Sequence, residues 1–109
     1  MGKFTFDADG SASWAFGFLC KYPLNTVKNI EVEFTKKDDS RVTVTATFED
    51  GTIAVAENGF RAGFFCESSV FLYDFLRLCK VHPLSASLVY HEKNNMVFHP
   101  NEEQLEKIL

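Results

Sequence analysis

Two stretches of the chain, residues 29–37 and 41–50, alternate between apolar and polar side chains, and residues 52–57 carry a large apolar side chain at every second position. Alternation with a period of two is typical of antiparallel strands that bury one face and expose the other. We therefore predict a meander of three antiparallel strands, in which the dipeptide Asp50-Gly51 forms the tight turn between the second and third strands.

The third strand of this meander carries its apolar side chains at Ile53 and Val55, which we expect to face the core. Asn58-Gly59 follows directly, and this dipeptide is typical of turns. The sequence thus predicts that the third strand ends at Asn58.

Residues 69–81 change to a helical period, with apolar side chains on one side and charged side chains on the other. Ser68 or Ser69 is the expected N-cap of this helix. His82 is the expected C-cap, because the proline that follows it cannot continue a helix.

The last part of the chain predicts two further elements. Residues 85–91 and 96–99 alternate like a second hairpin, with its turn at residues 93–95. Residues 100–109 predict a short terminal helix capped by Asn101.

The first 22 residues fit two structures. They can form a hairpin that turns at residues 9–10, or a strand followed by a buried helix over residues 12–21. The large–small alternation of residues 14–18 favours the hairpin, because Gly17 inside a helix costs about 1 kcal/mol relative to alanine. The helix stays open as the alternative.

Together these elements predict one α+β domain over residues 1–109. Its curved antiparallel sheet has five to seven strands, with one main helix packed on the apolar face and a short C-terminal helix. The expected core residues are those on the inward side of these elements: Ile30, Val32, Phe34, Val42, Val44, Phe48, Ile53, Val55, Phe71, Phe75, Leu78, Leu88, Tyr90 and Phe98.

Composition supports a single folded domain and excludes some functions. The chain has 109 residues, 46% of them hydrophobic, which suits one core. Its net charge of −4 and scattered basic residues do not suit a nucleic-acid backbone, so nucleic acid is not expected as a partner. Three cysteines without a CxxC spacing, no signal-like start and no long apolar run predict a cytoplasmic protein without membrane contact.

Cys66 is the first candidate for catalysis, because it precedes the main helix and a helix N-terminus favours the reactive thiolate. The neighbouring carboxylate of Glu67 and the apolar Phe64 and Phe65 favour the neutral thiol instead. We therefore interpret Cys66 as part of a buried elbow.

His91 and His99 form the second candidate. In the predicted hairpin they would lie on one face as diagonal neighbours, roughly 7–8 Å apart, where they could bind a metal or act as a base. No third ligand has a matching spacing, and no P-loop, GxGxxG, GxSxG or HExxH motif occurs. We assign no catalytic residue, metal or cofactor, and an enzyme is the less favoured class.

Aromatic residues are the strongest functional signal. The chain has 12 Phe, 3 Tyr and 1 Trp, more than a core of this size readily holds. Phe60, Arg61, Phe64 and Phe65 cluster in the loop before the main helix, and these residue types dominate protein interfaces. We predict a contact surface at these four residues, with burial in the core as the alternative.

The expected function is a non-enzymatic protein-binding module, such as a small inhibitor, adaptor or accessory protein. Its partner would be another protein or a second copy in a homodimer. One alternative is a protein that binds a small apolar ligand in a pocket between sheet and helix. The other, less favoured, is an enzyme that uses Cys66 with His91 or His99.

Overall fold

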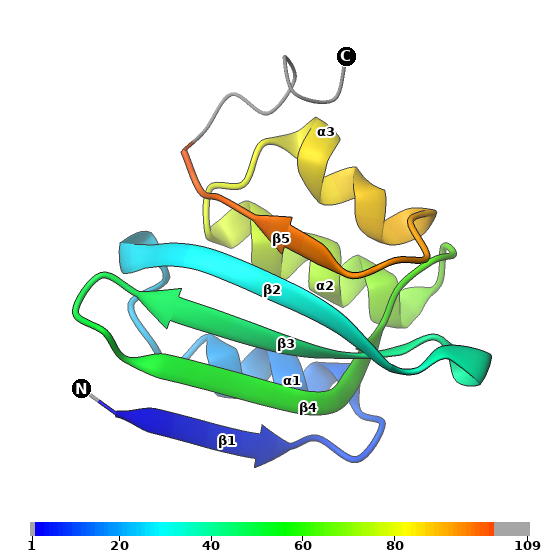
Figure 1. Cartoon of the computed structure of the whole chain (residues 1–109), viewed down its shortest axis with the longest axis horizontal. Helices are drawn as coiled ribbons and strands as arrows, with labels where there is room; N and C mark the ends of the chain where they lie inside the picture. Colours follow the sequence, from blue (N-terminus) through cyan, green and yellow to red (C-terminus); the bar gives the residue numbers. More distant parts are fainter. Residues whose placement is uncertain (1, 102–109) are drawn as a thin grey trace.

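Five strands form one open, mixed sheet in the order β1-β4-β3-β2-β5 (Figure 1). They are β1 (Lys3–Asp7), β2 (Val27–Lys36), β3 (Arg41–Phe48), β4 (Ile53–Arg61) and β5 (Met96–Phe98). The computed structural model describes residues 2–101, apart from the side chains at positions 36 and 37. The predicted meander is confirmed as β2, β3 and β4. β5 adds antiparallel to β2, whereas β1 pairs in parallel with β4, so the sheet is not wholly antiparallel.

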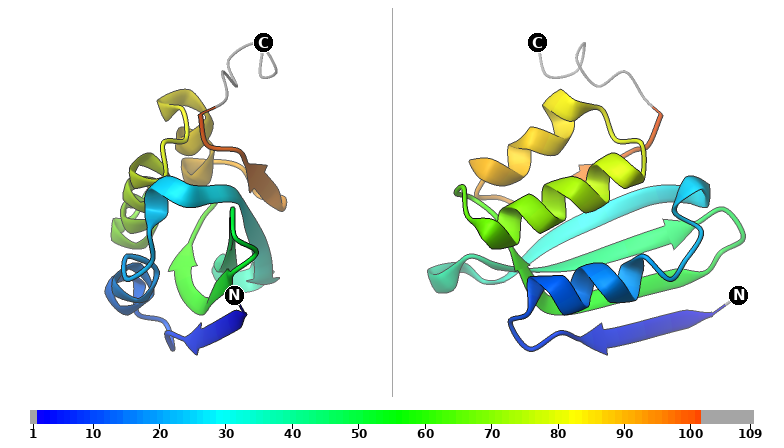
Figure 2. Two further views of the ribbon diagram at one scale, coloured as in Figure 1. Left: turned by 90° about the vertical axis from the view of Figure 1, so that its left-hand side faces the viewer. Right: turned by 180° about the vertical axis from the view of Figure 1, so that it is seen from behind.

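Helices α1 (Ala12–Leu19) and α2 (Glu67–Leu78) cover one face of the sheet (Figure 2). The short helix α3 (Pro83–Ala86) and the 3-10 turn η3 (Ser87–Tyr90) pack beside α2, and two further 3-10 turns are η1 (Leu24–Thr26) and η2 (Lys37–Asp39). Among the described residues, none of the helices has the length and apolar character needed to span a membrane. The α+β class, with a main helix on one face of the sheet, is confirmed.

The predicted N-terminal hairpin is wrong, and the alternative of a strand followed by a helix is right. Ser11 caps α1, because its Oγ accepts a hydrogen bond from the backbone N–H of Trp14 at 3.3 Å. Ala15 and Leu19, one turn apart, are fully buried. Packing of this face on the sheet outweighs the cost of Gly17, which lies on the outer side of the helix.

The inward side of β4 is opposite to the predicted one. Ala54 and Ala56 are fully buried under the helices, whereas Ile53 and Val55 pair with the outward-facing threonines of β3. The two alanines leave room for α1 to approach β4 closely, and this need for small side chains decided the orientation of the strand.

β4 does not end at Asn58-Gly59 but continues to Arg61. The pairing of β4 with β3 shifts next to the Val42–Phe60 pair, so a β-bulge stands where a turn was expected. Asn58 adopts a left-handed φ of 56°, and its C=O accepts a hydrogen bond from the N–H of Gly10 at 2.8 Å. The bulge therefore connects β4 to the loop that enters α1.

The predicted second hairpin is wrong over its first arm. Residues 83–90 are helical, and only Met96–Phe98 forms a strand. His82 is not the C-cap of α2 but the N-cap of α3, where its Nδ1 accepts the N–H of Leu84 at 3.2 Å. Pro83 occupies the first helical position, which tolerates a residue without an N–H. The predicted terminal helix falls on residues 102–109, outside the described residues.

Most of the expected core is confirmed. The buried members are Ile30, Val32, Val42, Val44, Phe48, Val55, Phe75 and Phe98, although Val55 lies on the outer face of the sheet. Those partly buried against the core are Phe34, Phe71, Leu88 and Tyr90. Leu78 is a wrong assignment, because it lies in the last turn of α2 with 52% of its surface exposed.

Candidate functional site

The loop between β4 and α2 divides the four predicted binding residues between core and surface. Phe60 is fully buried, so the alternative of core burial holds for this residue. Arg61 is half-buried at the end of β4. Phe64 and Phe65 are exposed by 43% and 73%. The division follows from the sheet: Phe60 is still part of β4 and its side chain points into the core, whereas Phe64 and Phe65 come after the chain has left the sheet.

Two backbone hydrogen bonds hold this loop to its neighbours. Ala62 N–H donates to the C=O of Ser40 at 3.1 Å, and Gly63 N–H donates to the C=O of Val89 at 2.8 Å. Gly63 has a φ of 94°, a conformation that other residues rarely adopt. The chain therefore turns outward at a fixed point.

Phe65 belongs to an aromatic surface built from three separate elements. Its ring lies 5.1 Å from that of Tyr90 in η3, and the Tyr90 ring stacks on Tyr73 of α2 at 5.4 Å. We call Phe64, Phe65, Tyr73 and Tyr90 the aromatic surface. Burial raises the pKa of Tyr90, and the nearby Tyr73 and Asp74 raise it further, so the Tyr90 hydroxyl stays protonated at neutral pH.

Sequence reasoning missed both tyrosines as surface residues. The predicted strand over residues 85–91 places Tyr90 in the core, whereas in η3 it is only partly buried against the core. Tyr73 is half-buried on α2, a position typical of a tyrosine with its polar end in water. The ring series from Phe65 through Tyr90 to Tyr73 depends on η3 lying beside α2, which no local pattern predicts.

Arg61 adds a cation close in sequence to this surface. The guanidinium forms no hydrogen bond or ion pair with other residues in the described part of the chain. Arg41, its partner across the β3–β4 ladder, instead forms an ion pair with Asp39 at 3.4 Å. The donors of Arg61 are thus available to a partner.

Cys66 has a structural role at the start of α2. It is the N-cap, in place of the predicted Ser68 or Ser69. The Oγ of the buried Ser69 accepts a hydrogen bond from the N–H of Cys66 and donates one to its C=O, both at 2.9 Å. These bonds fix the elbow that leads from Phe65 into the helix.

The two histidines are not brought together by a hairpin. His91 is exposed after η3, and His99 follows β5. Within residues 2–101, no group of three or more His, Cys, Asp or Glu side chains is placed to hold a metal ion.

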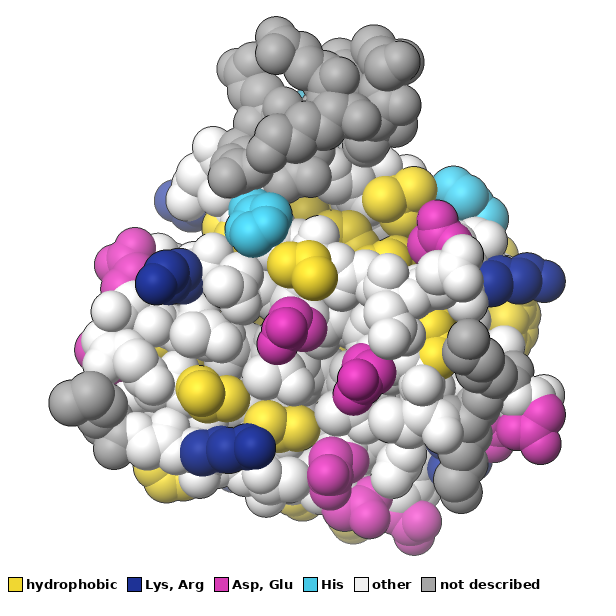
Figure 3. Space-filling model, viewed as in Figure 1, with side chains coloured by type: hydrophobic (Ala, Val, Ile, Leu, Met, Phe, Trp, Pro, Cys, Tyr) yellow, Lys and Arg dark blue, Asp and Glu magenta, His cyan; other side chains and the backbone are white. Residues whose placement is uncertain are grey.

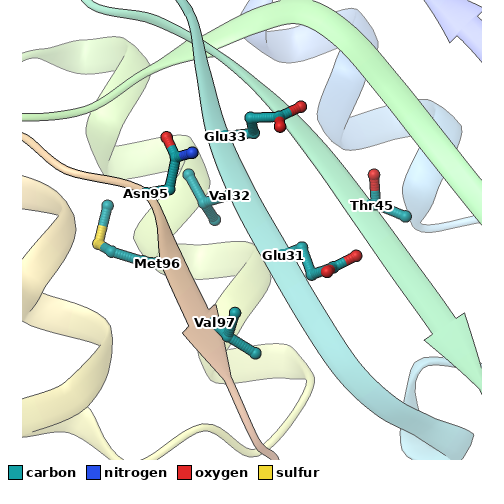
Figure 4. Close-up of a pocket in the computed structure, with 7 residues that line it drawn as sticks. All are labelled: Glu31, Val32, Glu33, Thr45, Asn95, Met96 and Val97. Carbon is teal, nitrogen blue, oxygen red and sulfur yellow. The ribbon is translucent and has the colours of Figure 1, made fainter.

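The sheet face opposite the helices is polar, and its hydrophobic side chains form only separate small patches (Figure 3). A shallow pocket of about 130 Å³ lies on this face between β2 and β5. In Figure 4 the carboxylates of Glu31 and Glu33 extend toward Thr45, away from β5. Ligand pockets usually measure about 300–1,000 Å³, so this hollow is small for a substrate.

An apolar groove of about 320 Å³ runs along the outer side of α1 beside β1. Its lining residues are Phe6, Ser13, Trp14, Gly17, Phe18 and Lys21. Trp14 is 67% exposed, and Phe6 stacks on Phe18 with ring centroids 5.2 Å apart. The groove is open to solvent and is separate from the aromatic surface.

Comparison with known protein families, with curated proteins and with solved structures gives no match for this chain. The exposure, charge and geometry of the described residues are therefore the basis on which a function can be proposed.

Proposed function

We propose that this protein is a non-enzymatic protein-binding module, an inhibitor, adaptor or accessory protein, that contacts its partner through the aromatic surface and Arg61. The observation that carries the proposal is the ring of Phe65, which is 73% exposed and yet held against Tyr90. A cytoplasmic setting belongs to the same proposal and is supported by three free thiols.

The geometry favours binding because the aromatic surface is ordered in advance. Tyr90, which stacks on Tyr73, supports the ring of Phe65, and the hydrogen bonds of Ala62 and Gly63 hold the loop. A side chain already held in place loses less conformational entropy when a partner covers it. Aromatic and Arg side chains are also the residues whose truncation most weakens interfaces.

A small apolar ligand is less well supported. Both the 130 Å³ pocket and the 320 Å³ groove open at the surface rather than between the sheet and α2. Ligand sites typically bury most of the ligand, which an open groove of this size does not do.

The proposal is tested with two matched variants, Phe65→Ser and Leu78→Ser. Both remove an apolar side chain that is more than half exposed, but only Phe65 belongs to the aromatic surface. Each should change the free energy of unfolding by no more than about 0.5 kcal/mol, which a melting curve checks.

Tagged wild-type and variant proteins are then used to capture partners from native extract, with quantitative mass spectrometry. We expect a partner retained by wild type and Leu78→Ser to lose at least about tenfold in affinity with Phe65→Ser, because truncating an interface anchor typically costs about 2 kcal/mol or more. A partner bound equally well by all three proteins would show that the aromatic surface is not the contact.

A further inference from the structure

Strand β1 forms one edge of the sheet, and no described strand pairs with its outer side. The C=O of Gly2 and the N–H of Ala8 bond to β4 at the two ends of β1. Because backbone groups alternate along a strand, Lys3, Thr5 and Asp7 direct their N–H and C=O groups away from β4. The edge therefore presents unpaired donors and acceptors with the spacing that another strand requires.

The sequence of β1, Lys-Phe-Thr-Phe-Asp, is complementary to itself when reversed. We propose that a second copy of this chain adds its own β1 antiparallel to this edge, with the two-fold axis passing beside Thr5. Lys3 then faces Asp7 of the second copy at both ends, and Phe4 faces Phe6 of the second copy. Opposite charges, paired aromatics and paired threonines are the cross-strand combinations that stabilise antiparallel sheets.

The register centred on Thr5 also agrees with the backbone. Lys3, Thr5 and Asp7 are the residues with outward N–H and C=O groups, and in this register they face one another as hydrogen-bonded pairs. The sheets of the two copies join into one continuous sheet with β1 at its centre. This closed, two-fold contact uses the same patch on both copies and leaves no β1 edge free.

The apolar groove gives the second copy a reason to bind at this edge. Phe6 stacks on Phe18 of α1, so the aromatic side of β1 is the side on which the helices lie. Even so, Phe4 is 49% exposed and Trp14 67% exposed, because α1 lies mainly over β4. Two-fold pairing places the two β1 strands about 4.8 Å apart, so that the grooves of the two copies face each other across the axis and their rings can cover one another.

The single chain gives no packing reason for a glycine at position 17 of α1. A Cβ added at Gly17 would meet no atom within 4 Å, although glycine weakens a helix relative to alanine. Gly17 lines the groove, where the absence of a side chain lets a second copy approach α1. The dimer uses residues outside the aromatic surface, so either surface can exist without the other.

Charge-reversal variants test this dimer by sedimentation or light scattering. Lys3→Asp alone sets like charges opposite each other at both ends of the paired strands, and so does Asp7→Lys. We expect the dissociation constant of each single variant to rise by about tenfold or more. The double variant Lys3→Asp/Asp7→Lys, and an equal mixture of the two single variants, should both recover association.

Recovery on mixing separates pairing from damage to the fold. Asp7 also accepts a hydrogen bond from the N–H of Asp9 at 2.9 Å, so Asp7→Lys changes the following turn as well. A variant that failed to fold could not be rescued by a second variant.

A backbone test uses Thr5→Pro, with Thr5→Val as its control. Proline removes the outward N–H without removing a bond to β4, so the chain should stay folded and become monomeric, whereas valine should keep the dimer. A wild-type chain that remains monomeric at its highest soluble concentration would overturn the proposal. A dimer that is insensitive to the substitutions at Lys3, Thr5 and Asp7, for example one that is lost only with Phe65→Ser, would also overturn it. The same holds if the β1 edge binds only a strand from another protein.

Discussion

Replacing Gly59 by alanine tests how closely α1 packs on the sheet. Gly59 is buried in the bulge of β4. An added Cβ would lie 2.5 Å from the Cβ of Ala15, 2.8 Å from the Cβ of Ala8 and 3.3 Å from the C=O oxygen of Ser11. The first two distances are roughly 1 Å shorter than the 3.5–4.0 Å at which carbon atoms pack best. The helix or the strand must therefore move.

The expected cost follows from two opposing effects. Overpacking a well-filled core typically costs about 1–3 kcal/mol. Replacing glycine by alanine returns about 0.4–1 kcal/mol by restricting the unfolded chain, since Gly59 does not adopt a left-handed φ. We expect a net loss of about 1–2 kcal/mol in the free energy of unfolding, or about 5–10 °C in Tm for a chain of this length.

The assay is urea unfolding followed by circular dichroism, with Gly17→Ala as the matched control. Gly17→Ala is the same substitution on α1, but its Cβ meets no atom within 4 Å, so it should stabilise the helix by up to about 1 kcal/mol. Gly59→Ala combined with Ala15→Gly removes the shortest contact, so the double variant should lose less than the sum of the two single losses. A Gly59→Ala protein as stable as wild type would refute the close packing of α1 on β4.

Three further predictions use other parts of the structure. Phe60→Ala should destabilise the protein by about 3–5 kcal/mol in denaturant unfolding, because Phe60 is fully buried; a change below about 1 kcal/mol would contradict its place in the core. Burial, and secondarily the charge of Cys20, raise the pKa of Cys79 to about 12. Iodoacetamide at neutral pH should therefore label Cys79 only when the protein unfolds, whereas the exposed Cys20 should be labelled earlier, as read by mass spectrometry. Labelling of both at one rate would contradict this. The N–H of Thr52 donates a hydrogen bond that lowers the pKa of Asp50, so this bond stabilises the fold above about pH 4 and its stabilisation is lost as the pH falls through the lowered pKa. Asp50→Asn should reduce this acid dependence of the melting temperature. An unchanged pH profile would contradict the prediction.

The sequence alone determined the elements whose periodicity is strong. β2 and β3 alternate over eight or more residues, and α2 keeps one apolar side through 12 residues. In such segments a different register or a different element would expose several large apolar side chains at once. The same reasoning identified Phe64 and Phe65 as candidates for a surface, although it could not separate them from Phe60.

Tertiary structure decided the orientation or the type of element in segments that are apolar on both sides or whose pattern is short. In β4, Ile53 and Val55 compete with Ala54 and Ala56 for the inward side, and only the approach of α1 favours the alanines. Residues 14–18 alternate like a strand but lie in a helix, because burial of one helical face against β4 contributes more than the local preference.

The candidate site depends on tertiary structure for the same reason. The aromatic surface joins a loop, a helix and a 3-10 turn whose residues lie up to 26 positions apart, from Phe64 to Tyr90. Local patterns report which side of an element is apolar, but not which elements lie next to each other. The sequence therefore determined that aromatic side chains would remain exposed, and the packing of η3 against α2 decided which of them lie together.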